Sequence, residues 1–330
     1  MEERADAQRI AEILTSVREK ERPVLIATHR RPDGDGLGCC LAAHSLLERL
    51  GIEGILYCPD LVPRRYHFLP RNGLFTTELP ESGALDLAIL LDAGRRERVL
   101  APEEGLDWRI VNIDHHYDNS LFGDVNWVRT EVSSVGEFLP ELWEAFSMGL
   151  SLDEATCLYT AIVTDTGSFQ FPNTTVDSFV RAGQFARKGV DPGSIANKIF
   201  CSTPIEAVRL MSRVLSTTEV HDKYPVAWMV VKRKDLEQTG ATYEEMERFS
   251  DVPRSVVGAA MGILFVEEED GMTHVSLRCK KGCDVSRLAA RFGGGGHKQA
   301  SAFDTPATWQ ETLEGIIQAL ADNGLKEIRE

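Results

Sequence analysis

Five short apolar runs, separated by helical patterns, fill the first part of the chain. They lie at residues 24–28, 54–58, 87–91, 109–113 and 125–128. Continuous runs of this length are typical of strands that are covered on both faces, because neither side of such a strand meets water. Strands that alternate with helices, such as the one expected at residues 39–50, predict an α/β fold. Its core would be a doubly wound, mostly parallel sheet.

Helical patterns then extend to residue 216, and a smaller α+β pattern follows. Ser134 with Glu137 and Ser151 with Glu154 have the spacing of capping boxes. Pro140 is expected to bend or break the first of these two helices. The predicted parts are a first domain, a helical connector and a second domain, at residues 1–190, 191–216 and 217–330.

The elements expected beyond the first sheet follow from the same patterns. The predicted helices lie at residues 175–188, 191–200, 204–216, 284–292 and 308–321. The predicted strands lie at residues 225–232, 256–268, 273–280 and 300–303. Between the last predicted strand and the helix before it stands a run of glycines, at residues 293–296.

Residues of the kinds that bind metal ions follow four apolar elements of the first domain. They are His29, Asp33 and Asp35; Asp92; Asp114, His115 and His116; and Asp165. Because functional residues in an open parallel sheet lie just beyond the carboxyl ends of the strands, we expect these side chains to converge. Several carboxylates in one crevice repel one another, and divalent cations would offset that repulsion.

Each of these segments has a simpler interpretation when it is taken alone. An aspartate after a strand is usually a turn residue or a helix cap, and Asp-His-His can be a polar loop. The first loop, "THRRPDGDG", lacks the P-loop pattern and misses the dinucleotide fingerprint. Asp33 and Asp35 would also repel a bare phosphate. We therefore predict that this loop binds cations and that the cations in turn bind a phosphate group of the ligand.

Composition narrows the class of protein further. The net charge of −15 argues against a protein that coats long nucleic acid, because such binding requires many phosphates to be neutralised. No apolar run approaches the length of a membrane span, and the charged N-terminus lacks the features of a signal peptide. The seven scattered cysteines do not suggest a disulfide framework. A cytoplasmic protein is expected.

Together these motifs resemble those of a known enzyme family. The series H-x-x-P-D-x-D, then Asp92, then D-H-H, then Asp165 resembles the motifs of the DHH phosphoesterases. The segment "RFGGGGHKQASAF" resembles the glycine-rich motif of the DHH-associated C-terminal domain. The arrangement is most similar to the stand-alone nanoRNase (oligoribonuclease) and pAp-phosphatase branch. On this resemblance, residues 1–190 are the DHH catalytic domain and residues 217–330 the DHH-associated substrate-binding domain.

The chain departs from the family pattern at two places. Cys39 stands where members often have serine, and Ala300, Ser301 and Ala302 stand where the family commonly has Ala-Ala-Gly. Neither change removes an expected metal ligand. The second bears on the substrate pocket.

The resemblance implies a centre of two Mn²⁺ ions, with Mg²⁺ or Co²⁺ as substitutes. It assigns His29, Asp33 and Asp92 to one ion, and Asp35, Asp92, His115 and Asp165 to the other. The catalytic residues implied are Asp114, expected to orient His115, and His116, expected to face the scissile phosphate. The substrate-binding residues implied are Arg278, Gly293, Gly294, Gly295, Gly296 and His297.

The activity implied is hydrolysis of short RNA or DNA oligonucleotides and of 3′-phosphoadenosine 5′-phosphate (pAp). Cleavage of cyclic or linear dinucleotides is the alternative. A processive exonuclease fits the acidic chain less well, and an inorganic pyrophosphatase would not need the glycine-rich segment. A nucleotide-sensing module without catalysis should have lost ligands, and none is missing. The resemblance also leaves room for a homodimer.

Overall fold

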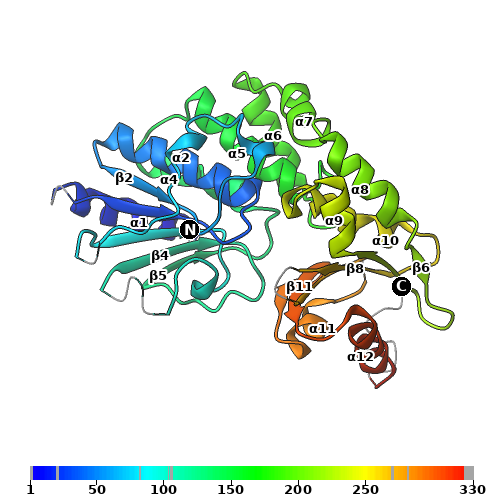
Figure 1. The fold of residues 1–330 in the computed structure, drawn as a ribbon. Helices are drawn as coiled ribbons and strands as arrows, with labels where there is room; N and C mark the ends of the chain where they lie inside the picture. The colour runs from blue at the N-terminus through cyan, green and yellow to red at the C-terminus, as the bar shows by residue number, and fades with distance from the viewer. Residues whose placement is uncertain are drawn as a thin grey trace. The chain divides into compact units, whose positions relative to one another are not determined.

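The structure is a computed structural model, and it divides into two compact units, residues 1–202 and 203–330 (Figure 1). It describes residues 3–19, 22–81, 83–102, 104, 107–268, 271–280 and 282–322. Two helices that make up the expected connector, α7 (Pro192–Phe200) and α8 (Ile205–Leu215), fall on either side of this division. The three-part division of the chain stays a prediction. Among the described residues, no helix is both long enough and apolar enough to cross a membrane.

A five-stranded parallel sheet forms the centre of the first unit, which confirms the predicted fold class. Its strands in spatial order are β2 (Gly54–Tyr57), β1 (Val24–Ala27), β3 (Leu87–Leu91), β4 (Arg109–Asp114) and β5 (Val125–Val128). Every neighbouring pair is parallel. The chain leaves β1 toward β2 on one side and returns to β3 on the other. That change of direction is the place where open α/β sheets bind their ligands.

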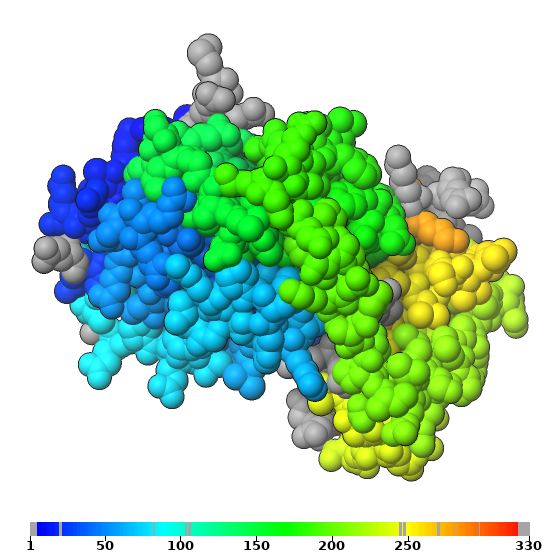
Figure 2. Space-filling view, turned by 90° about the horizontal axis from the view of Figure 1, so that it is seen from above, coloured from blue at the N-terminus to red at the C-terminus, as the bar shows by residue number. Residues whose placement is uncertain are grey.

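Helices and the larger apolar core cover one face of this sheet. The helices besides α7 are α1 (Glu3–Arg18), α2 (Gly34–Leu50), α3 (Val135–Phe138), α4 (Glu141–Ala145), α5 (Leu152–Asp165) and α6 (Val176–Arg187). In the space-filling view of Figure 2, the blue and green segments together cover this side of the unit. A smaller core with Leu85, Val99, Leu100 and Trp108 packs on alternate strand residues such as Leu25. Both faces of β1 and β3 are therefore buried, as their sequences predicted, whereas alternate residues of β5 are only partly buried.

Glycines bring α2 close to its neighbours. A β-carbon on Gly36 would lie 2.0 Å from the Thr28 hydroxyl oxygen, and one on Gly38 would lie 2.4 Å from the Cys157 carbonyl oxygen. Helix α2 therefore packs directly on α5 and on the end of β1. It begins at Gly34, five residues before the predicted start, because Asp33 caps it. The glycines of the first loop serve this close packing.

The two expected capping boxes have different outcomes. Ser151 and Glu154 form a capping box at the start of α5, as predicted. Ser134 makes no such bond, so the first box is wrong. The Glu137 carboxylate instead accepts hydrogen bonds from the Ser133 backbone and side chain. The predicted break at Pro140 is confirmed, since α3 ends at Phe138 and α4 starts at Glu141.

The second unit contains a mixed six-stranded sheet. Its strands in spatial order are β10 (Gly295–His297), β11 (Ala300–Thr305), β9 (Thr273–Cys279), β8 (Met261–Glu267), β7 (Val226–Val231) and β6 (Glu219–Val220). Only β7 and β8 are parallel among these pairs. Two apolar cores pack on the sheet, one on each face. The helices of this unit besides α8 are α9 (Arg233–Thr239), α10 (Asp251–Ser255), α11 (Ser286–Arg291) and α12 (Trp309–Asp322).

Two predictions in the second unit need correction. The strand expected at residues 256–268 is shorter, because helix α10 reaches Ser255 and β8 starts only at Met261. No strand is predicted within the glycine run, but Gly295–His297 forms strand β10 and pairs with β11. The segment "EDGM" at residues 269–272 predicts a turn before β9, and its residues 269 and 270 lie outside the described residues.

Candidate metal centre

The first group of predicted ligands lies after β1 and in the first turn of α2. Asp33 caps α2 with one oxygen, Oδ1, which accepts from the Asp35 and Gly36 backbone N–H groups at 3.0 and 3.1 Å. Its other oxygen, Oδ2, lies 3.9 Å from Nε2 of His29. Asp33 is therefore both the helix cap of the simpler interpretation and a neighbour of His29.

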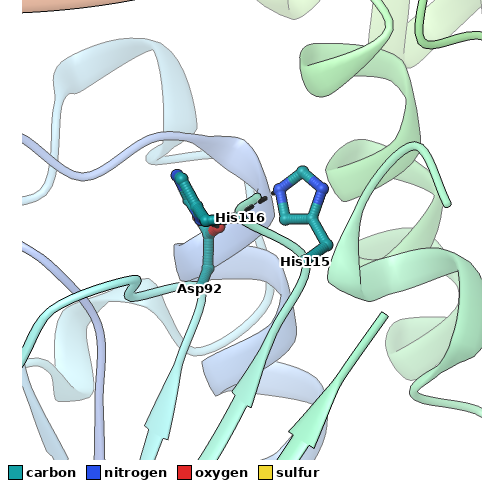
Figure 3. A group of neighbouring side chains, drawn as sticks. All are labelled: Asp92, His115 and His116. Carbon is teal, nitrogen blue, oxygen red and sulfur yellow. Dashed lines mark ion pairs between the residues drawn. The ribbon is translucent and has the colours of Figure 1, made fainter. Parts of the chain in front are cut away.

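Asp92 follows β3 directly and is 1 % exposed. Its φ of +56° lies in the left-handed region, which few residues other than glycine and asparagine adopt easily. This backbone conformation aims the carboxylate at residues from two other strands. Oδ2 lies 3.3 Å from His29 Nε2, and Oδ1 lies 3.5 Å from both His115 Nε2 and His116 Nδ1. Figure 3 shows Asp92 together with the two histidines that follow the neighbouring strand β4.

Three carboxylates surround the imidazole of His115. Its Nε2 lies 3.1 Å from Asp165 Oδ2, 3.5 Å from Asp92 Oδ1 and 3.7 Å from Asp35 Oδ2. Asp165 is the last residue of α5, so the packing of α5 against α2 positions it beside the strand ends. Residues from four separate parts of the chain therefore meet around this nitrogen.

The Asp35 carboxylate is fixed by partners that the sequence did not reveal. Its Oδ2 accepts from the Val135 backbone N–H at 2.7 Å, and its Oδ1 accepts from that of Gly136 at 3.0 Å. The Cys39 thiol lies 3.2 Å from the same Oδ1 and donates to it. Backbone donors leave no signature in side-chain patterns. The only feature of the sequence that points to this contact is Gly136, a small residue in a mainly apolar segment.

Asp114 contacts a different histidine from the one expected. Its Oδ1 accepts a hydrogen bond from His116 Nδ1 at 2.7 Å, so it orients His116 and not His115. The reason is geometric, since residues two apart in extended backbone point to the same side. The other oxygen of Asp114 accepts a hydrogen bond from the Asn119 side-chain amide, and Asp114 is fully buried.

The charges of this cluster are unevenly distributed. Burial and the neighbouring Asp92 raise the pKa of Asp33 to about 6, and burial with Asp92 and Asp165 raises the pKa of Asp35 well above its usual value. Burial would also raise the pKa of Asp92, but the imidazoles of His115 and His29 outweigh it and hold that pKa well below its usual value. A cluster in which some carboxylates resist ionisation is one that cations would stabilise.

The pKa values of His115 and His116 shift in the opposite direction from that expected for burial. Burial would lower the pKa of His115, but Asp165 and Asp92 raise it well above its usual value. Burial likewise opposes the charged form of His116, and Asp114 raises its pKa. The same pair lowers the pKa of Asp114 to about 2 against the effect of burial.

Two sets of side chains could each hold a metal ion, and Asp92 adjoins both. In each set the ligand atoms lie within 4.8 Å of one another, and the sets are His29, Asp33 and Asp92, and Asp35, His115 and Asp165. A third such grouping consists of Asp92, His115 and His116. Asp92 Oδ1 is buried and accepts no hydrogen bond from the residues that the structure describes. A buried acceptor without a donor, among nitrogen and oxygen ligands, fits a divalent cation such as Mn²⁺.

The predicted substrate-binding residues lie in the second unit. Arg278 stands on β9 opposite Ala300 of β11 and is half-buried. Burial lowers its pKa from the ordinary value. The side chain of His297 lies outside the described residues, and only its backbone is placed, in β10.

The glycine run has a structural role that the sequence did not indicate. A β-carbon on Gly294 would lie 2.1 Å from the Ala302 carbonyl oxygen, and one on Gly296 would lie 2.6 Å from that of Ala300. Both glycines therefore allow β10 and the residue before it, Gly294, to approach β11 closely. Because strand packing already requires them, a role for the run in substrate binding stays a prediction.

Comparison with known proteins agrees with this arrangement. The DHH family N-terminal domain matches residues 23–162, and the DHHA1 domain matches residues 223–323. The chain is 30% identical over 324 residues to the bifunctional oligoribonuclease and PAP phosphatase NrnA of Thermus thermophilus, covering 96% of this chain and 94% of the relative. The protein of the same name from Bacillus subtilis is 27% identical over 291 residues, which cover 87% of this chain and 90% of the relative.

Solved structures show the same fold. An exopolyphosphatase-related protein from Bacteroides fragilis superposes with a TM-score of 0.82 at 25% identity, over 96% of each chain. RecJ from Thermus thermophilus in complex with Mn²⁺ has a TM-score of 0.59 at 12% identity, over 99% of this chain and 56% of RecJ, and shows likeness of fold alone. With its parallel sheet, its converging aspartates and histidines and both domain matches, the chain belongs to the DHH family of phosphoesterases.

Proposed function

We propose that this chain is a manganese-dependent phosphohydrolase of short oligonucleotides and of pAp. One observation carries the proposal, namely that the two carboxylate oxygens of Asp92 face two different sets of ligand atoms. Relatives that match most of the chain support the substrate class, since they are named as bifunctional oligoribonucleases and PAP phosphatases.

The proposed ligands divide into two sets that share Asp92. One set is His29, Asp33 and Asp92, and the other is Asp35, Asp92, His115 and Asp165. Two divalent ions held there would supply a hydroxide near neutral pH and offset the charge that develops on the phosphoryl group. Mixed imidazole and carboxylate ligands suit Mn²⁺ better than Mg²⁺, which favours shells made of oxygen alone.

His116 is the residue that we assign to proton transfer at the leaving oxygen. Its Nδ1 donates to Asp114, so the ring is held in one orientation, and Nε2 is the nitrogen that we assign to the substrate. The Asp114 carboxylate raises the pKa of His116 against the effect of burial, which favours the protonated ring needed for this role. The chemistry requires no serine or cysteine nucleophile.

The second unit would hold the part of the substrate that does not react. Arg278 is half-buried on β9, opposite the small residue Ala300 of β11, and its planar guanidinium suits the oxygens of a phosphate. We therefore expect Arg278→Ala mainly to raise KM and to change kcat little. Gly293, Gly294, Gly295, Gly296 and His297 remain proposed contacts.

Hydrolysis of cyclic or linear dinucleotides is the second candidate function. It is favoured by one similarity, to the cyclic-di-AMP phosphodiesterase GdpP of Geobacillus thermodenitrificans. The chain is 25% identical to that protein over 353 aligned positions, covering 97% of this chain but only 50% of the relative. The same ligand sets would serve either substrate, and only kinetics separates the two.

One substrate panel tests the proposal. Chelator-treated protein is supplied with Mn²⁺, Mg²⁺ or Co²⁺ and assayed on pAp, RNA and DNA dimers to pentamers, pApA, cyclic dinucleotides, pyrophosphate and long single strands. We expect turnover of pAp and short oligonucleotides that is highest with Mn²⁺ and absent in Asp92→Asn. Turnover of pyrophosphate alone would contradict the substrate class. Tight nucleotide binding without any turnover would instead indicate the sensing module.

A further inference from the structure

Arg98 lies against the candidate metal centre, and its role is not explained by the ligand sets. It ends the short helical turn η3 (Arg96–Arg98), which follows Asp92. Its guanidinium nitrogen Nη2 lies 3.1 Å from Nδ1 of His29. Its backbone carbonyl accepts from the Arg30 N–H at 2.8 Å, and the next residue, Val99, is buried. The loops after β1 and β3 therefore hold Arg98 beside His29.

The contacts of His29 Nδ1 cannot all be hydrogen bonds at once. This nitrogen lies 2.8 Å from the Arg30 carbonyl oxygen, which can only accept, and 3.1 Å from Arg98, which can only donate. Nδ1 carries either a proton or a lone pair. It can satisfy the carbonyl or the guanidinium, but not both.

A cation at the centre would decide between these partners. His29 Nε2 faces the carboxylates of Asp92 and Asp33, so it is the nitrogen that would ligate the ion. The proton must then sit on Nδ1, where it is donated to the Arg30 carbonyl, as in other histidine ligands. Arg98 loses its acceptor on the ring, and its positive charge is left at the edge of the centre.

The other arginines of the same segment have partners elsewhere. Arg96 donates to the Ala101 and Pro102 carbonyl oxygens, each at 3.3 Å. Arg95 is more than half exposed and lies 3.8 Å from Asp118. Of these three arginines, Arg98 is the one whose guanidinium reaches a predicted metal ligand.

We infer that Arg98 is a substrate-binding residue, which donates to a phosphate oxygen of the substrate beside the ion held by His29. This inference rests on the proposed function. A planar guanidinium suits the paired oxygens of a phosphate, and it is always charged. Arg98 would then add a positive charge on the substrate side, beside the ion held by His29. The alternative is a structural role, in which Arg98 only positions His29.

Metal binding and phosphate binding, measured separately, distinguish the two roles. Calorimetry first measures Mn²⁺ binding to the wild type, Arg98→Gln and Arg98→Lys, and then the binding of inorganic phosphate to the Mn²⁺-loaded proteins. Arg187→Gln, at the exposed end of α6, controls for the loss of one positive charge. The kinetics of pAp hydrolysis accompany these titrations.

We expect Arg98→Gln to bind Mn²⁺ as tightly as the wild type or more tightly, because a like charge has been removed. Phosphate affinity should fall about 10–100-fold, the loss typical of a hydrogen bond to a charged group, with partial recovery in Arg98→Lys. A parallel loss of Mn²⁺ affinity, or unchanged phosphate affinity, overturns the inference. If the wild type binds Mn²⁺ and phosphate but hydrolyses nothing, the proposed function fails while the titrations still decide the role of Arg98.

Discussion

Asp114 and His116 form a buried pair, in which Oδ1 of the carboxylate accepts from Nδ1 of the imidazole at 2.7 Å. The pair lies at the end of β4, and His116 Nδ1 is also 3.5 Å from Asp92. The carboxylate therefore fixes the orientation of His116 and raises its pKa against the effect of burial. Asp114 therefore has the role that we expect of a residue that orients His116, which differs from the role of a metal ligand.

Asp114→Asn should lower kcat about 10–100-fold, the usual effect of removing a partner that orients a functional histidine. Mn²⁺ affinity should change far less than in His115→Ala, because Asp114 contacts His116 and not a proposed ligand. Without the carboxylate the pKa of His116 falls. The alkaline limb of the pH–rate profile should therefore move to lower pH if the protonated ring is needed. Equal loss of Mn²⁺ binding in both variants would show that Asp114 supports the metal ligands instead.

Asp92→Asn should reduce Mn²⁺ affinity by about 100-fold or more and leave no measurable hydrolysis, because both ligand sets lose a charge. Asparagine is the informative substitution, since it tolerates the φ of +56° found here. Asp92→Ala adds about 1 kcal/mol of backbone strain to the same loss of charge. Calorimetric titration with Mn²⁺ checks the first effect and thermal unfolding of the metal-free proteins checks the second. Retention of one tightly bound ion would contradict a shared Asp92.

The strands and most of the candidate site could be predicted because they depend on short-range patterns. Strand β3 begins at Leu87 and ends at Leu91, as predicted, since a fully buried strand is a continuous apolar run. His29, Asp92 and His115 meet because the carboxyl ends of parallel strands share one edge of the sheet. That rule requires no knowledge of which residues touch.

The rest depends on contacts that no local pattern encodes. Asp35 is held by the backbone of Val135 and Gly136, a hundred residues later, and backbone N–H groups look alike in every sequence. The histidine partner of Asp114 depends on which side of the chain each residue faces after the strand ends. The strand at Gly295–His297 was missed because glycine is rare in strands, and only the close approach of β11 makes it suitable there.

Glu154→Gln should destabilise the protein by about 2 kcal/mol at neutral pH. The Glu154 side chain is buried and joins α5 to α2, since its oxygens lie 3.0 and 2.8 Å from Arg49 and 2.9 Å from Ser45. Glutamine keeps the shape and one acceptor oxygen for the capping box, so the variant removes the charge and one of the two acceptors. Asp86→Asn, which breaks the exposed pair with Arg22 in the same unit, should cost less than about 1 kcal/mol.

The effect of Glu154→Gln should also depend on pH. Burial would raise the pKa of Glu154, but the Ser151 backbone and Arg49 lower it overall. Because the pKa of Glu154 is depressed in the folded state, its ionised carboxylate stabilises the protein at pH values above the ordinary pKa of 4.5. This stabilisation is lost as the pH falls through the folded-state pKa. Urea unfolding at pH 7 and at about pH 3 should therefore show a difference that shrinks in acid. A difference that is constant with pH would assign the effect to packing.

Gly136→Ala should destabilise the fold by about 1–3 kcal/mol and also weaken Mn²⁺ binding. Its β-carbon would lie 2.5 Å from that of Ala161 and 2.9 Å from the Leu158 carbonyl oxygen, so the backbone must shift away from α5. That shift moves the two N–H groups that hold Asp35. Gly183→Ala, in the exposed part of α6 with no atom within 4 Å of the new carbon, should instead stabilise by up to about 1 kcal/mol. Unfolding curves and Mn²⁺ titrations of both variants check this, and unchanged Mn²⁺ affinity in Gly136→Ala would mean that Asp35 does not need its backbone donors to act as a ligand.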